Sequence, residues 1–235
     1  MTGAARRIGR CIALKLAEQG ADVVIHYRRS RAEAEQVVKE ISVTGRRAIA
    51  CPAELTKKQE IENLLSLVEE CFGRLDILVN NAGMFSPARI DEMTEEQWDT
   101  MLDLNLKGAF LTLKHSLPRL MERRAGTVVG ISPLGGLVGQ PGSAAYAASK
   151  WGLRGLLESA ALEAKPHGIR VSLVFPHNIN SAGRAIEPGS PERQRNLEPE
   201  EVASVVAFLC AAPEHVSIGN LTVWPRAAGI AGTIL

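Results

Sequence analysis

A tyrosine and a lysine stand four positions apart in the stretch YAASK, as Tyr146 and Lys150. The small residues between them favour a helix, on which side chains at i and i+4 face the same side and can act together. A free phenol has a pKa of about 10, too high for efficient proton exchange at neutral pH. A nearby ammonium favours the phenolate, so we expect Lys150 to lower the pKa of Tyr146. The pair would then act as a proton donor and the group that tunes it.

A glycine-containing turn precedes the first helical pattern. The segment TGAARRIG (2–9) leads directly into IGRCIALKLAEQG. Gly3 and Gly9 allow the backbone to approach a pyrophosphate, and the amides of a helix N-terminus favour such an anion. Two glycines alone are a weak signal, because a plain turn before a helix also needs them.

Basic residues gather where the next strand pattern ends. The segment HYRRS (26–30) has no acidic residue that could bind the hydroxyl pair of a ribose. Several guanidiniums at one place suit a 2′-phosphate, so the pattern predicts NADPH as the cofactor in preference to NADH. The alternative is a solvated basic loop. The residues concerned are Arg6, Arg7, Arg28, Arg29 and Ser30.

Short runs of β-branched residues alternate with longer helical patterns. The runs that predict strands are 21–27, 46–53, 75–83, 126–132, 169–176 and 220–225. The helical patterns are 8–19, 31–44, 57–72, 95–122, 144–165 and 199–211. Strands that are apolar throughout are buried on both faces, so the alternation predicts an α/β fold with a doubly wound parallel sheet between two helical layers. Ligands bind at the carboxyl ends of the strands in such folds.

The bulk composition bounds the class of protein. With 235 residues, 46% hydrophobic and 23% charged, the chain predicts one soluble globular domain over 1–235. With a net charge of +1, the chain has no overall positive charge that would attract nucleic acid. No apolar run approaches the roughly 18 residues that a membrane-spanning helix needs. The 4 cysteines lie far apart and no two histidines have ligand spacing, which argues against a metal site and for the cytoplasm. We therefore expect a small-molecule substrate.

Four motifs occur in the order and spacing of one known family. They are TGAARRIG, NNAG (80–83), the N-x-x-G of Asn105 to Gly108, and YAASK. Over nearly the whole chain they resemble the short-chain dehydrogenases/reductases. Arg7 (where most members carry a second glycine) and HYRRS look most like the pteridine reductase branch, with 3-oxoacyl-carrier-protein reductases as the near alternative. The resemblance implies a Rossmann-type fold and hydride transfer to a carbonyl or imine carbon, with Tyr146 as the proton donor.

The resemblance also implies roles for single residues. Lys150 would hold the nicotinamide ribose, and Asn105 would fix a water in the proton relay to Lys150. Glu54, where members usually have Asp, would read the adenine. The residues expected to bind the cofactor are Gly3, Arg6, Arg7, Ile8, Gly9, Tyr27, Arg28, Arg29, Ser30, Glu54, Leu55, Asn81, Ala82, Gly83, Tyr146, Lys150, Pro176 and Ile179.

One position departs from the family at the chemistry itself. Thirteen residues before the tyrosine, members carry a serine that binds the substrate oxygen, and pteridine reductases carry Asp. This chain has Pro133 there, and losing such a donor typically costs about 10²–10³ in rate. Ser132 is adjacent, but successive side chains of a strand point to opposite faces, so it substitutes only if the strand end twists. We expect its hydroxyl to be bonded to the backbone instead.

Other departures concern the walls of the site and the sheet. His177 replaces a glycine, and 222–229 stands where many members have V-D-G-G. The loop-like composition of 178–199 predicts a substrate lid. Only Met1 precedes Thr2, where members have a central first strand, so we expect unpaired edges inside the sheet.

Two functions compete at this point. The first is an NADPH-dependent reductase of a small carbonyl or pterin-like substrate. The second is a catalytically impaired dinucleotide-binding protein, a sensor or partner subunit, which Pro133 favours. The helices near 95–122 and 144–165 carry more apolar residues than the side of each helix that faces the core needs. We therefore expect these helices to form the interface of a homodimer or homotetramer.

Overall fold

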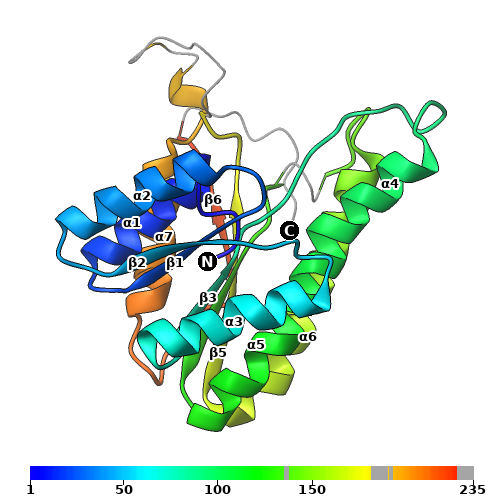
Figure 1. Ribbon diagram of the computed structural model, residues 1–235. Coiled ribbons are helices and arrows are strands. Elements are labelled where there is room, and N and C mark those ends of the chain that lie inside the picture. The colour runs from blue at the N-terminus through cyan, green and yellow to red at the C-terminus, as the bar shows by residue number, and fades with distance from the viewer. Residues whose placement is uncertain (135–137, 181–189, 191–192, 227–235) are drawn as a thin grey trace.

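The computed structural model describes residues 1–134, 138–180, 190 and 193–226. Its helices are α1 (Arg7–Glu18), α2 (Arg31–Val43), α3 (Lys58–Phe72), α4 (Glu95–Leu102), α5 (Gly108–Arg123), α6 (Ala144–Ala164) and α7 (Pro199–Ala211). Its strands are β1 (Val23–Tyr27), β2 (Ala48–Pro52), β3 (Ile77–Asn80), β4 (Gly126–Ile131), β5 (Ile169–Pro176) and β6 (Asn220–Val223). Helices α1, α2 and α7 cover one face of the strands, and α3, α5 and α6 cover the other (Figure 1). The predicted α/β class is confirmed.

The strands form two parallel sheets. β1 pairs with β2, while β3, β4, β5 and β6 pair in that order. β1 and all of β4 after its first residue are buried, as their continuous apolar character predicts for strands covered on both faces. The predicted strand and helix ranges differ from the observed ones mainly at their ends.

Residues 1–4 lie between the two sheets, at the place where the family's first strand is expected. On one side, the Ala4 N–H donates to the His26 carbonyl at 3.0 Å, and the His26 N–H donates to the Met1 carbonyl at 3.3 Å. On the other side, the Thr2 N–H donates to the carbonyl of Val79 at 3.0 Å. The expectation of unpaired inner edges is therefore wrong at these residues, because their backbone bonds both neighbours as a strand would.

The helix predicted over 95–122 is interrupted. A π-helical turn, η1 (Asp103–Lys107), separates α4 from α5. Such turns insert an extra residue without leaving helical dihedral angles, so hydrophobic periodicity alone does not reveal them. The turn carries Asn105, which is fully buried.

Apolar side chains are exposed on the layer formed by α4, α5 and α6. Phe110 and Trp151 are 41% and 49% exposed, and Leu106, Phe110 and Leu156 line a groove of about 410 Å³. The predicted self-association through this layer stays a prediction, as does the cytoplasmic location.

Within the described part of the chain, no helix is long and apolar enough to cross a bilayer.

Gly130 allows α6 to pack directly against β4. A Cβ atom at this position would overlap Cδ1 of Leu157, which is fully buried in the core between β4, β5 and α6. Since α6 also carries Tyr146 and Lys150, this close approach fixes the distance of both side chains from the sheet.

We predict that Gly130→Ala lowers the free energy of unfolding by about 1–3 kcal/mol, because the added methyl forces Leu157 and α6 away from β4. Gly155→Ala is the matched control. Gly155 lies on α6, as Leu157 does, and its added methyl would meet no neighbouring atom within 4 Å. The free energy of unfolding of this variant should rise by roughly 0.5–1 kcal/mol, because alanine favours a helix more than glycine does. Urea denaturation of both variants measures the difference. Equal stability of the two variants would contradict this account of the packing.

Candidate active site

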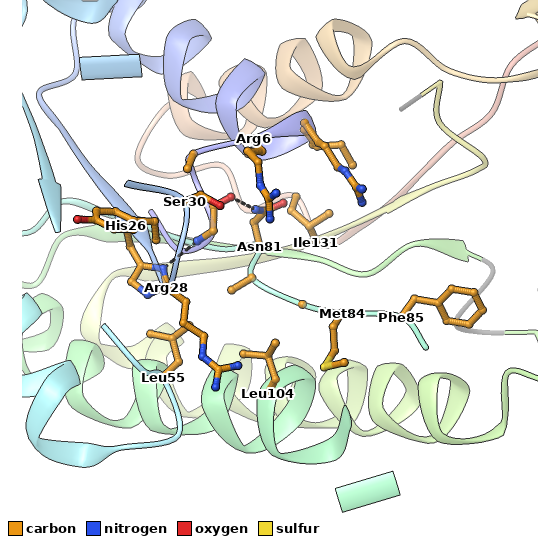
Figure 2. Close-up of a pocket in the computed structure, with 18 of the residues that line it drawn as sticks. Arg6, His26, Arg28, Ser30, Leu55, Asn81, Met84, Phe85, Leu104 and Ile131 are labelled. Atoms are coloured by element: carbon orange, nitrogen blue, oxygen red, sulfur yellow. Dashed lines mark hydrogen bonds between the residues drawn. The ribbon is translucent and has the colours of Figure 1, made fainter. Parts of the chain in front are cut away.

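One pocket of about 670 Å³ collects nearly all the residues that the sequence predicted for the cofactor. It runs along the carboxyl ends of the strands, as expected for a doubly wound fold. Figure 2 shows Arg6 and Ser30 at its upper side, Arg28 and Leu55 at its lower left, and Met84 and Phe85 at its right-hand end. The predicted residues that line it are Gly3, Arg6, Arg7, Ile8, Gly9, Tyr27, Arg28, Arg29, Ser30, Glu54, Leu55, Asn81, Ala82, Gly83, Tyr146 and Lys150.

Thr2 and Asn81 hold the glycine turn in place. The Thr2 hydroxyl accepts the N–H groups of Asn81 at 2.9 Å and Ala82 at 3.0 Å. The Asn81 amide donates to the carbonyls of Thr2 and Gly3, both at 3.0 Å. The side chain of Asn81 in the NNAG motif thus holds the glycine turn in place. This structural role is separate from the predicted contact of the motif with the ribose.

The turn ends on a residue in the left-handed region. Arg7 has φ of 52° at the first position of α1, a conformation that costs a residue with a side chain about 1–2 kcal/mol. A glycine would adopt it without strain, which explains why most family members carry one here. Arg6, the N-cap residue, makes no side-chain cap and the first turn holds no acid, so the amides of α1 face the pocket ready for an anion.

His26 is a structural part of the site that the sequence analysis missed. Its ring is 3% exposed; Nδ1 accepts the Gly3 N–H at 3.0 Å, and Nε2 lies 2.9 Å from the Ala53 carbonyl. This pairing fixes the neutral tautomer with the proton on Nε2. Burial lowers the pKa of His26 to about 4. One side chain therefore joins the glycine turn to the segment after β2.

The basic end of the pocket is less free than predicted. Arg28 Nε lies 2.5 Å from Glu54 Oε2, and Arg6 lies 3.9 Å from Glu33. Arg29 makes no ion pair within the described residues. Ser30 precedes α2, and its hydroxyl makes no capping bond to that helix. The predicted basic residues line one pocket, but Arg28 lies across it from Arg6 (Figure 2), and both of these guanidiniums are paired with carboxylates.

Tyr146 and Lys150 lie on one side of α6, as the spacing predicted. Lys150 Nζ is 5.7 Å from the centre of the Tyr146 ring and donates a hydrogen bond to the Ile131 carbonyl at 3.4 Å. Lys150 as a whole is 3% exposed. Burial raises the pKa of Tyr146 to about 12 and lowers that of Lys150 to about 8. The expected lowering of the phenol pKa is therefore wrong for these surroundings, because desolvation outweighs the ammonium at this distance. At neutral pH the phenol is protonated, which is the form that donates a proton.

Asn105 is held by its side chain from the π turn. Its Oδ1 accepts the Met84 N–H at 2.8 Å, and its Nδ2 donates to the Met84 carbonyl at 2.9 Å and to Ser149 Oγ at 3.1 Å. Ser149 in turn donates to the Tyr146 carbonyl at 2.7 Å. This network ties the segment that follows β3 to η1 and α6. A side chain at Gly83 would approach Asn105 Oδ1 to 3.1 Å, so the last residue of NNAG has to be small.

Pro133 lines the pocket and Ser132 does not. The alternation expected along the strand therefore persists to its end. Ser132 is fully buried, and its hydroxyl has no hydrogen-bond partner within the described residues, so the expected backbone bond is wrong. Ser132 does not occupy the position of the family's substrate-binding serine.

Two predicted cofactor residues fall outside the lining. Pro176 ends β5, and Ile179 packs against the core with a bridge to Leu197. His177, expected to change the pocket wall, stacks on Trp224 with ring centres 4.8 Å apart. Half of the predicted lid (181–189 and 191–192 of 178–199) and residues 227–229 of the segment 222–229 lie outside the described residues.

The comparison with known families decides the assignment. Residues 1–187 match the model of the family described as short chain dehydrogenase. The chain belongs to that family. The 3-oxoacyl-(acyl-carrier-protein) reductase FabG of Staphylococcus epidermidis is a relative, with 36% identity over 219 residues that cover 90% of each chain. This short-chain dehydrogenase is accordingly an oxidoreductase.

Solved structures agree with the assignment. A metagenomic short-chain oxidoreductase in complex with NADP superimposes with a TM-score of 0.84 and 35% identity, over 96% of this chain and 95% of that one. An acetoin dehydrogenase from Salmonella typhimurium gives a TM-score of 0.87 and 27% identity, over 99% and 97%. The short-chain dehydrogenase fold thus extends over nearly the whole chain.

We predict that His26 makes this short-chain dehydrogenase less stable in mild acid. Its pKa is about 4 when folded and about 6.5 when unfolded, so only the unfolded chain takes up the proton between these values. The contribution of His26 to stability is full above pH ~6.5 and falls by about 3 kcal/mol as the pH approaches ~4.

Denaturation at several pH values, compared with His26→Asn, measures this effect. Asparagine can still accept the Gly3 N–H but does not titrate, so its stability should change less over this range. Burial also lowers the pKa of His177, and that contribution cancels in the comparison. Parallel pH curves for the two proteins would contradict the assignment to His26.

Proposed function

We propose that the chain is an NADPH-dependent reductase of ketones that carry apolar substituents, with 3-oxoacyl compounds as the substrate class. The observation that carries this proposal is the single pocket in which Tyr146 and Lys150 share the lining with the arginine cluster. The solved oxidoreductase in complex with NADP and the 3-oxoacyl reductase relative support the cofactor and the substrate class.

The residues present fit a 2′-phosphorylated dinucleotide. The α1 amides and the strained Arg7 face the place where a pyrophosphate would be held. The segment after β1 offers Arg28, Arg29 and Ser30, with no acidic residue within it to bind a ribose diol. When bound, NADPH supplies the hydride.

The reacting end of the pocket is apolar. Phe85 packs edge-on against Tyr146 with ring centres 5.0 Å apart, and Met84 lies beside Phe85 (Figure 2). Pro133 also lines the pocket. A pterin ring would leave its N–H groups without partners on these side chains, whereas an acyl chain buries apolar surface there. This favours a ketone over a pterin.

Burial sets the protonation states of Tyr146 and Lys150, and these states decide what each residue does in the reaction. Tyr146 is the neutral phenol at pH 7, so it donates a hydrogen bond to the substrate oxygen and passes its proton to that oxygen as negative charge develops. Lys150 is mostly protonated at pH 7, and its charge stabilises the phenolate that remains.

Tyr146→Phe tests this role directly. It removes the proton donor and leaves the ring contact with Phe85, so kcat should fall by about 10²–10⁴ while the Kd for NADPH changes by less than about threefold. Loss of NADPH absorbance with a 3-oxoacyl thioester measures turnover, and fluorescence titration measures binding. A wild-type chain that binds NADPH without turnover would support the impaired-protein alternative instead.

Pro133→Ser should raise kcat by at least about tenfold, because it returns a hydroxyl donor to a lining position beside the substrate oxygen. Ser132→Ala is the matched comparison. Its hydroxyl lies outside the pocket lining, so kcat should change less than about twofold. If Ser132→Ala abolishes turnover and Pro133→Ser gives no gain, Ser132 is the donor and our placement is wrong.

A further inference from the structure

An ion pair lies inside the part of the pocket that is proposed to receive the 2′-phosphate. Tyr27 and Pro52 are partners in the register of β1 and β2, so the residues that follow these strands emerge side by side. There Arg28 Nε meets Glu54 Oε2 at 2.5 Å, and both residues line the pocket.

This pair differs from the other one in the pocket. The Glu54 side chain is 17% exposed, whereas Glu33, the partner of Arg6, is 49% exposed and sits at 3.9 Å. The Arg28 side chain is 51% exposed and that of Arg6 is 63% exposed, so the Arg28–Glu54 pair is the closer of the two and has the more buried carboxylate. A closer pair with a less exposed partner interacts more strongly. Arg28 is thus the guanidinium whose charge is most strongly compensated.

Glu54 is also poorly arranged to read an adenine as its family counterpart does. Its Oε2 is taken by Arg28, and its backbone N–H donates to Glu60 Oε2 at 2.6 Å. Figure 2 shows Arg28 extending alongside Leu55, on the opposite side of the pocket from Arg6. The geometry points to a role for Glu54 that acts through Arg28.

We propose that Glu54 determines cofactor specificity by compensating Arg28, and so lowers the preference of the pocket for a 2′-phosphorylated dinucleotide over an unphosphorylated one. A phosphate monoester brings a charge of about −1.5 to −2, which Glu54 repels and with which it competes for Arg28. NADH lacks the 2′-phosphate, so the carboxylate affects its binding less than that of NADPH. This inference rests on the proposed use of NADPH.

The test is Glu54→Gln, which keeps the shape of the side chain and removes its charge. Fluorescence titration gives the Kd for NADPH and for NADH. We expect the ratio of the NADH Kd to the NADPH Kd to rise about fivefold, through tighter NADPH binding, with the NADH Kd changed less than twofold. The rise should shrink in high salt.

Glu35→Gln is the matched control. It removes the same charge from the exposed pair with Arg31 on α2, where the side chains are 50% and 78% exposed, so the ratio should stay within about twofold. Thermal unfolding of both variants checks that the fold is retained.

Two outcomes overturn the inference. Equal weakening of NADPH and NADH in Glu54→Gln would assign Glu54 to the adenine, and an unchanged ratio would make the ion pair irrelevant to binding. The wild-type ratio tests the proposed function separately. A wild type that prefers NADH would overturn the NADPH assignment, while a gain in NADPH affinity in Glu54→Gln would still support the role of Glu54.

Discussion

The site depends on how residues 1–4 are bonded between two sheets. Their backbone bonds β1 through His26 on one side and β3 through Val79 on the other, while the side chains of Asn81 and His26 reach back to hold Gly3. These bonds measure 3.0–3.3 Å and are at least partly buried, where an unmade bond costs about 1–3 kcal/mol. The glycine turn is therefore as rigid as the sheet edges that hold it. Its amides keep their direction toward the pocket without a ligand.

A second constraint sets the position of the reacting groups. The close contact of Gly130 with Leu157 fixes α6 against β4, and the bonds of Asn105 to Met84 and Ser149 fix it against η1 and the segment that follows β3. These contacts hold α6 at two places, at Ser149 near its N-terminal end and at Leu157 about two turns further on. Lys150 is buried by this packing, and the lowered pKa of its ammonium follows from it.

The sequence predicted most of the pocket because its motifs fall where strands end. In a parallel sheet those ends meet at one edge, so linear spacing is enough to bring Gly3, Asn81 and Tyr146 together. It could not predict His26, which looks like any strand residue until its ring is placed between Gly3 and Ala53. The same holds for interactions that depend on register or on burial: the contact of Arg28 with Glu54, and the direction of the Tyr146 pKa.

The apolar surroundings of Tyr146 and the presence of Pro133 at the position of the family's serine affect the same proposed step. In the proposed reaction, with Pro133 in place of a hydroxyl, Tyr146 would be the hydrogen-bond donor to the substrate oxygen among the described side chains around Phe85. A phenol in apolar surroundings resists ionisation, yet a hydrogen bond that it makes there is stronger than in water, since the local dielectric constant is lower. Charge that develops on the oxygen is then stabilised by the phenol and, behind it, by the buried ammonium of Lys150. In the proposed reaction, the stronger hydrogen bond of the desolvated phenol would partly offset the lost donor, while the raised pKa of Tyr146 would oppose release of its proton. Turnover would then depend on how well water is excluded from this end of the pocket.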